Sequence, residues 1–92
     1  MTEKTVTISD PGGLHARPAA RFVEVARSFQ AEITVERMSG PSANAKSIMS
    51  LLALGAENGT IVTIRADGPD AEEAVAVLSA LLVKESNEGG PR

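Results

Sequence analysis

GGLHARPAARFVEVARSF, residues 12–29, contains the only histidine of this 92-residue chain. From residue 16 onward, apolar side chains recur at the spacing of one helix face, which predicts an amphipathic helix over residues 16–29. The apolar face consists of Ala19, Phe22, Val23, Ala26 and Phe29. The two glycines before the helix permit backbone conformations that other residues avoid. The stretch therefore predicts a turn that leads into a helix, with His15 at the junction.

The segments on both sides of this helix show the alternation of apolar and polar residues that is typical of half-buried strands. Strands are predicted at residues 4–9, 32–37, 42–44 and 61–66. The stretch KSIMSLLAL at residues 46–54 predicts a short helix, for which Gly55 is a natural C-cap. A last helix is predicted over residues 71–82, where Asp70 and Glu73 have the spacing of a capping box.

The predicted order is strand, helix, strand, strand, helix, strand, helix. Because each helix has one apolar face, the simplest way to bury these faces is a two-layer α/β sandwich with the helices on one side of the sheet. A chain of 92 residues has room for one domain, which is predicted at residues 1–85. Residues 86–92 have nothing to bury and are expected to be a disordered tail.

Composition and charge exclude several classes of function. The net charge of -3 and the presence of only two aromatic residues count against a nucleic-acid-binding or membrane-surface protein. The absence of cysteine excludes disulfides and thiolate metal sites, and no metal or cofactor is predicted. No segment approaches membrane-spanning length and the N-terminus lacks an apolar signal core, so a cytoplasmic monomer is expected.

His15 is expected to be more than a loop histidine. If it is the N-cap, Ala16, Arg17 and Pro18 form the first helical turn, and the backbone N–H groups of Ala16 and Arg17 are free to bind an anion. Arg17 and Arg21 lie four residues apart on the same helix face and add positive charge. These residues predict a phosphate site beside an imidazole, but they leave open whether the protein carries or hydrolyses the phosphate.

Three stretches resemble HPr, the family of histidine-containing phosphocarriers of the bacterial phosphoenolpyruvate-dependent sugar phosphotransferase system. They are GLHARPAARFVEVA (13–26), NAKSIMSLLALGA (44–56) and GTIVTI (59–64). The resemblance extends from about residue 4 to residue 83. It implies a four-stranded antiparallel sheet in the order 1-4-2-3, with three helices on one face.

The resemblance also assigns roles to residues of the first stretch. It implies that His15 is phosphorylated at Nδ1, that Arg17 neutralises the phosphoryl oxygens and that Pro18 belongs to the same motif. The donor would be a phosphohistidine on enzyme I and the acceptor a histidine on a sugar-specific enzyme IIA. The protein would then be a stoichiometric carrier rather than a stand-alone enzyme. Gly12 departs from the asparagine that many members have there.

The short helix is expected to bind these partners. Ile48, Met49 and Leu52 share one side of it, and the resemblance implies that they dock enzyme I and enzyme IIA together with Arg21. Leu51 and Leu54 are expected to face inward, and Arg27 and Lys46 to be solvated charges.

Ser47 stands at the start of the short helix, where serine is a good N-cap. The resemblance implies that it is also the family's regulatory serine, phosphorylated by an ATP-dependent kinase. A serine kinase/phosphorylase and a transcriptional regulator are then further expected partners.

Three alternatives remain at this point. A small acyl-phosphate hydrolase would also hold phosphate with arginine and backbone amides, but it leaves the stretch AKSIMSLLALG without a role. A nucleic-acid-binding module would need an aromatic pair on its central strands, which this sequence lacks. Within the family, a phosphocarrier of a regulatory, nitrogen-related branch is the alternative to sugar uptake.

Overall fold

The computed structural model describes residues 1–9, 13–38 and 40–83. These residues form seven elements in the predicted order. They are β1 (Thr2–Thr7), α1 (Ala16–Ala26), β2 (Glu32–Arg37), β3 (Ser42–Asn44), α2 (Ile48–Leu54), β4 (Ile61–Asp67) and α3 (Ala71–Leu82). Gly12 and the predicted tail at residues 86–92 lie outside the described residues.

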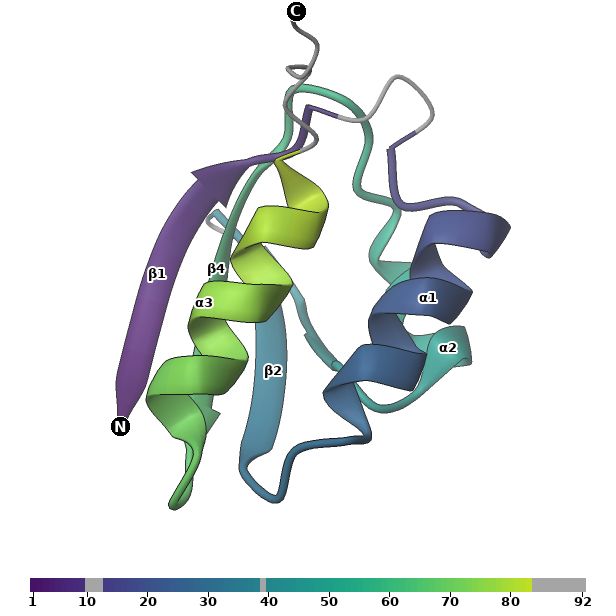
Figure 1. Ribbon diagram of the computed structural model, residues 1–92. Coiled ribbons are helices and arrows are strands. Elements are labelled where there is room, and N and C mark those ends of the chain that lie inside the picture. Colours follow the sequence, from purple (N-terminus) through teal and green to yellow (C-terminus); the bar gives the residue numbers. More distant parts are fainter. Residues whose placement is uncertain (10–12, 39, 84–92) are drawn as a thin grey trace, which may run out of the picture.

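The four strands form one antiparallel sheet in the order β1-β4-β2-β3, which confirms the expected order 1-4-2-3. The register places Thr5 opposite Thr63 and Val35 opposite Ile64. The three helices cover one face of this sheet, and the other face is open (Figure 1). The fold is therefore the predicted two-layer sandwich.

The hydrophobic core lies between the sheet and the helices. Val35 and Ile64 on the sheet and Leu51 and Leu78 on the helices have no exposed surface, and Phe22 of α1 is 1% exposed. These are the apolar positions that the alternation of the strands and the spacing of the helices predict. Burial of a large apolar side chain contributes about 1.5–3 kcal/mol, so this layer holds the helices against the sheet.

Several boundaries differ from the prediction. The strand β1 covers Thr2–Thr7 rather than residues 4–9, and β4 ends one residue later than predicted, at Asp67. The helix α1 ends at Ala26 rather than Phe29, because Ser28 N and Phe29 N donate to carbonyls three positions back in a tighter turn. The helix α2 begins at Ile48, directly after Ser47, which was predicted to be its N-cap.

The predicted capping box at the start of α3 is wrong. Asp70 is the N-cap of α3, but its side chain does not cap the helix. Its two carboxylate oxygens instead accept hydrogen bonds from the backbone N–H groups of Gln30 and Ala31, both at 2.9 Å. The hydrogen bond from Gln30 holds the pKa of the Asp70 carboxyl below its usual value. Asp70 thus ties the start of α3 to the loop before β2.

The Asp70→Asn variant is expected to be less stable than the parent at neutral pH, because one amide oxygen replaces two carboxylate oxygens that accept separate hydrogen bonds. A lowered folded-state pKa stabilises the fold above the usual value of 3.8, and this contribution is lost as the pH falls through the folded value. The variant should therefore lose less stability on acidification. Urea unfolding at neutral pH and between pH 4 and about pH 2 measures both effects.

A matched control for this prediction is Asp67→Asn, which removes an exposed carboxylate that accepts no hydrogen bond from the other described residues. It is expected to leave the stability at neutral pH unchanged. Equal loss of stability in the two variants would contradict the claim that the hydrogen bonds between Asp70 and the loop before β2 stabilise the fold.

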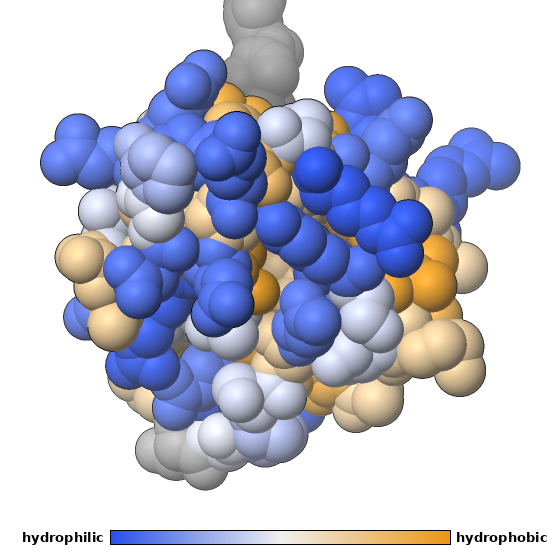
Figure 2. Space-filling view, turned by 90° about the horizontal axis from the view of Figure 1, so that it is seen from below, coloured by the Kyte–Doolittle hydropathy of each residue, from blue (hydrophilic) through white to orange (hydrophobic). Residues whose placement is uncertain are grey.

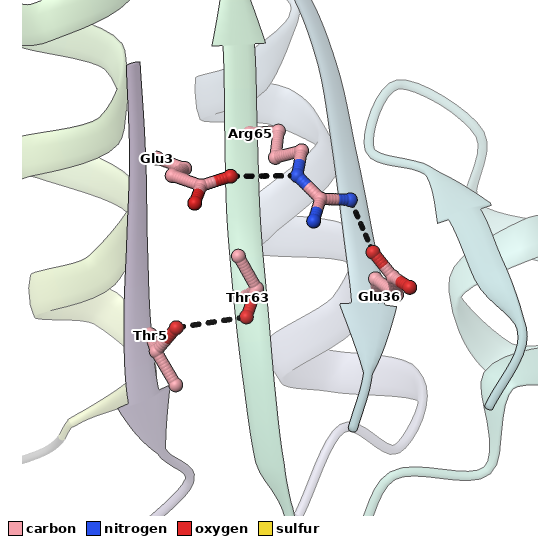
Figure 3. Close-up of polar contacts among 5 residues, drawn as sticks. All are labelled: Glu3, Thr5, Glu36, Thr63 and Arg65. Carbon is pink, nitrogen blue, oxygen red and sulfur yellow. Dashed lines mark hydrogen bonds and ion pairs between the residues drawn. The ribbon is translucent and has the colours of Figure 1, made fainter. Parts of the chain in front are cut away.

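The open face of the sheet carries polar side chains (Figure 3). Arg65 on β4 pairs with Glu3 on β1 at 2.7 Å and with Glu36 on β2, and Thr5 hydrogen-bonds Thr63 at 2.8 Å. The hydrogen bond to Glu3 contributes most to raising the pKa of the Arg65 guanidinium. These groups are solvent-accessible, so the ion pairs contribute little to stability.

The end of the molecule opposite the first turn of α1 is mainly polar. Figure 2 shows this end, where hydrophilic side chains cover most of the surface and apolar ones appear between them and along one edge. Among the described residues, no helix has the length and apolar character that crossing a membrane requires.

Candidate functional site

A groove of about 650 Å³ opens where the first turn of α1 meets the C-terminal end of α3. These two helix ends lie at the same end of the molecule (Figure 1). The groove brings together three of the predicted site residues, His15, Arg17 and Arg21. The rest of its lining is mostly apolar and consists of Ile8, Gly13, Leu14, Pro18, Phe22, Ala80, Leu81 and Leu82.

His15 is the N-cap of α1, as predicted. Its backbone is extended, with φ -92° and ψ -170°, and its carbonyl accepts the first hydrogen bond of the helix from Ala19 N at 2.9 Å. The imidazole does not cap the helix and is exposed. Neither Ala16 N nor Arg17 N donates to an acceptor in the described part of the chain. The ring is therefore accessible beside two backbone donors that have no acceptor within residues 1–9, 13–38 and 40–83.

Arg17 and Arg21 supply the positive charge of the groove. Both side chains are exposed, and neither has a carboxylate within ion-pair distance among the described residues. Arg21, one of the residues predicted to dock partners, lines the same groove as His15. An anion in the groove would meet two guanidinium groups and the N-terminus of a helix, all of which favour negative charge.

The segment that follows α2 positions His15. Leu14 is buried and its N–H donates to Ala56 O at 2.9 Å. Gly13 has φ +67°, and a Cβ built on it would lie 2.6 Å from Glu57 Cα and 2.8 Å from Ala56 O. A side chain at this position would push the two segments apart. The need for glycine was predicted, but sequence reasoning missed Ala56 and Glu57, which carry no local signal of this contact.

The helix α2 presents the residues expected to bind partners. Met49 is 73% exposed and Leu52 is 37% exposed, whereas Ile48 is half-buried against the core. We call these three residues the α2 patch. The burial of Leu51 and Leu54 confirms that they face inward.

The predicted caps of α2 are confirmed. Ser47 Oγ accepts a hydrogen bond from Ser50 N at 3.2 Å, which makes Ser47 the N-cap. Gly55 has φ 67° in the left-handed region and ends the helix. Both caps depend on groups within one helical turn, which explains why the sequence predicted them.

Arg27 and Lys46 were expected to be solvated charges. Arg27 is exposed, as expected, and Lys46 is half-buried, but both side chains also donate to backbone carbonyls. Arg27 Nε donates to Lys46 O at 3.1 Å, and Lys46 Nζ donates to Phe29 O at 2.8 Å. The two side chains thus connect the end of α1 to the turn before α2.

The chain is similar to proteins of one family. A family model described as "PTS HPr component phosphorylation site" matches residues 2–84. The phosphocarrier protein HPr of Vibrio cholerae is 54% identical over 82 residues, which cover 89% of this chain and 95% of that protein. The HPr-like protein Crh of Halalkalibacterium halodurans is 44% identical over 85 residues, which cover 92% of this chain and all of that protein.

A solved structure shows the same similarity. The crystal structure of HPr-C-His from Thermoanaerobacter tengcongensis superposes with a TM-score of 0.87 at 42% sequence identity. The match covers 98% of this chain and 100% of that one. The similarity therefore includes the groove beside His15, α2 and the whole sheet.

Proposed function

Since the chain belongs to the HPr family, the phosphocarriers of the phosphotransferase system, we propose that His15 is the residue that carries the phosphoryl group. One observation supports this assignment above the others. The only imidazole of the chain is exposed at the N-terminus of α1, in a groove that it shares with Arg17 and Arg21. The donor is enzyme I and the acceptors are enzymes IIA, the kinds of partner that the family implies.

Phosphoryl transfer between two histidines requires an accessible nucleophile and stabilisation of the charge on the phosphoryl oxygens. His15 Nδ1 attacks the phosphorus of the phosphohistidine on enzyme I, so that one N–P bond forms as the other breaks. Negative charge is spread over the phosphoryl oxygens during the transfer. The N–H groups of Ala16 and Arg17 directly follow His15 in the first turn of α1, and Arg17 lines the same groove, so these groups would stabilise that charge. Phosphorylated His15 would then transfer the phosphoryl group to a histidine of enzyme IIA by the same exchange of N–P bonds.

The experiment that tests this proposal is incubation with enzyme I and phosphoenolpyruvate, followed by peptide mapping of the modified residue. We expect one acid-labile, alkali-stable phosphoryl group, located on His15. A chain that stays unmodified, or that carries the group on another residue, would contradict the proposal.

Arg17→Glu is expected to lower kcat/KM for phosphorylation by enzyme I at least about tenfold, which corresponds to about 1.4 kcal/mol of transition-state stabilisation. The substitution replaces an attractive charge by a repulsive one next to the transferred group. The fold should be unaffected, because Arg17 is exposed and a glutamate in the first helical turn is favourable. Lys4→Glu is the matched control, since it makes the same charge change on β1. Equal rates for the two variants would remove Arg17 from the site.

The α2 patch is proposed to be the surface that docks enzyme I and enzyme IIA. Met49 and Leu52 are apolar and exposed beside α1, which carries the proposed phosphorylated histidine. An exposed apolar side chain in the centre of an interface contributes more to binding than a charged residue at its rim. Arg21 would contribute positive charge from the groove beside His15.

Ser47 is proposed to be the regulatory site, phosphorylated by a serine kinase. It immediately precedes Ile48 and Met49, so a phosphoryl group there would place a dianion at the edge of the α2 patch. The N-terminus of α2 would tolerate that charge, whereas an apolar partner surface would not. Phosphorylation of Ser47 would therefore weaken docking without unfolding the protein.

We propose sugar uptake rather than a purely regulatory branch as the pathway served. The identity of 54% to the phosphocarrier protein of Vibrio cholerae, against 44% to the HPr-like protein Crh, supports this choice. The family assignment also favours a carrier over the acyl-phosphate hydrolase and the nucleic-acid-binding module that the sequence had left open.

A further inference from the structure

Arg37, the last residue of β2, reaches from the sheet to the end of α2. It lies opposite the buried Val62 in the register, on the face of the sheet that the helices cover. Its Nη1 donates to Leu54 O at 3.1 Å and lies 3.5 Å from Gly55 O. These are carbonyls at the C-terminal end of α2, where a positive charge is favourable. Arg37 therefore caps α2 from another element.

The residues that follow this cap support the loop before His15. Ala56 O accepts the hydrogen bond from Leu14 N at 2.9 Å. Gly13 is packed so closely on Glu57 that a Cβ there would lie 2.6 Å from Glu57 Cα. The segment 54–57 is thus held by Arg37 at one end and carries the Gly13–Leu14 backbone at the other.

We propose that Arg37 is a positioning residue for phosphoryl transfer. By holding the carbonyls of Leu54 and Gly55, it fixes the segment on which Gly13 and Leu14 rest, and so fixes the His15 ring relative to the α2 patch. Arg37 touches neither the ring nor the transferred group. The inference rests on the proposed function, because it takes His15 to be the reacting residue.

The physical reason is the geometric demand of the transfer. A phosphoryl group moves between two nitrogen atoms that must lie in line, and a misplacement of about 1 Å can cost about 100-fold in rate. Without Arg37 the Leu54 carbonyl loses its charged partner. Leu54 and Ala56 stay buried in the core, but segment 54–57 loses the contact that fixes its first residues to β2 and can shift by a small amount. A shift of that segment moves Leu14, and with it His15, while the α2 patch keeps its own contacts with the core.

The test compares Arg37→Met with Arg37→Lys, and with Arg65→Met as the matched control. Arg65 is an arginine of the adjacent strand, but it lies on the open face, away from the groove (Figure 3). Phosphorylation by enzyme I is measured over a range of carrier concentrations. Hydrogen exchange of the Leu14 amide is measured relative to that of the core residue Ile64, so that a general loss of stability cancels.

For Arg37→Met we expect kcat to fall about tenfold with KM within about twofold of the parent. The Leu14 amide should exchange faster relative to Ile64. Arg37→Lys should recover most of both properties, because an ammonium group can donate to the same carbonyl. Arg65→Met should behave as the parent.

The inference is overturned if Arg37→Met has the same kcat as Arg65→Met, or if its amide exchange rates at Leu14 and Ile64 rise by the same factor. It is also overturned if Arg37→Lys recovers neither the kcat nor the slow exchange of the Leu14 amide. Failure of the proposed function is recognised separately. It would appear in the parent protein as a phosphoryl group mapped to a residue other than His15, before any variant of Arg37 is compared.

Discussion

The His15→Ala protein is expected to fold as the parent does and to accept no phosphoryl group from enzyme I. His15 is the only histidine of the chain, so no second imidazole can take over the transfer. The effect on stability should be within about 0.5 kcal/mol, the usual range for an exposed side chain with no special contact. The structure supports this expectation, because the ring is exposed and its side chain does not cap α1.

Mass analysis after incubation with enzyme I and phosphoenolpyruvate measures the loss, and thermal unfolding confirms that the variant is folded. The expected result is an unmodified chain with a Tm close to that of the parent. An acid-labile, alkali-stable phosphoryl group on the His15→Ala chain would refute the assignment of His15. A collapse of the Tm would instead refute the view that the imidazole is free of structural contacts.

Ser47→Asp is expected to lower kcat/KM for phosphorylation by enzyme I by at least about tenfold, with the fold retained. Aspartate is as good an N-cap as serine, so the hydrogen bond now made to Ser50 N can be replaced. The new charge, however, adjoins Ile48 and Met49 at the edge of the α2 patch. A charge left unpaired when an interface closes over it costs about 2–5 kcal/mol, which exceeds the 1.4 kcal/mol that a tenfold loss requires.

Two further variants separate charge from loss of the serine. Ser47→Ala removes the cap and should lose about 0.5–2 kcal/mol of stability while transferring nearly as well as the parent. Ser42→Asp makes the same substitution on β3, where the side chain is exposed on the sheet, and should leave transfer unchanged. Phosphotransfer assays with enzyme I measure the rate of transfer, and urea unfolding measures the free energy of unfolding. If Ser47→Asp transfers as fast as Ser42→Asp, the α2 patch is not the docking surface.

Local patterns in the sequence predicted much of this protein correctly. The alternation in EITVER and the helical spacing from Ala19 onward depend on neighbouring residues alone. The strand forms where expected, and the helix begins where expected but ends three residues early. The same holds for Ser47 and Gly55, whose capping roles are decided within one helical turn. The strand order was predicted in another way. It was implied by the resemblance to HPr and not by the periodicity of the sequence.

Predictions from local patterns were wrong where a side chain can bind either a neighbouring residue or a distant one. Asp70 and Glu73 have the spacing of a capping box, yet the Asp70 carboxylate binds Gln30 N and Ala31 N, about 40 positions earlier in the chain. The predicted solvated charge of Lys46 is likewise bound to Phe29 O. In both cases the fold places a backbone group close to the side chain, and this group competes with the local partner or with water. No pattern in the sequence indicates that the two groups lie close together.

The sequence by itself determined the order of the elements, the caps of α2 and the position of an imidazole at the start of a helix. Each of these depends on side-chain periodicity or on hydrogen bonds within one turn. The tertiary structure alone decided that Gly13 and Leu14 rest on Ala56 and Glu57, and that Arg37 holds the end of α2. These contacts join segments far apart in the chain, and their existence depends on where packing of the core places each backbone.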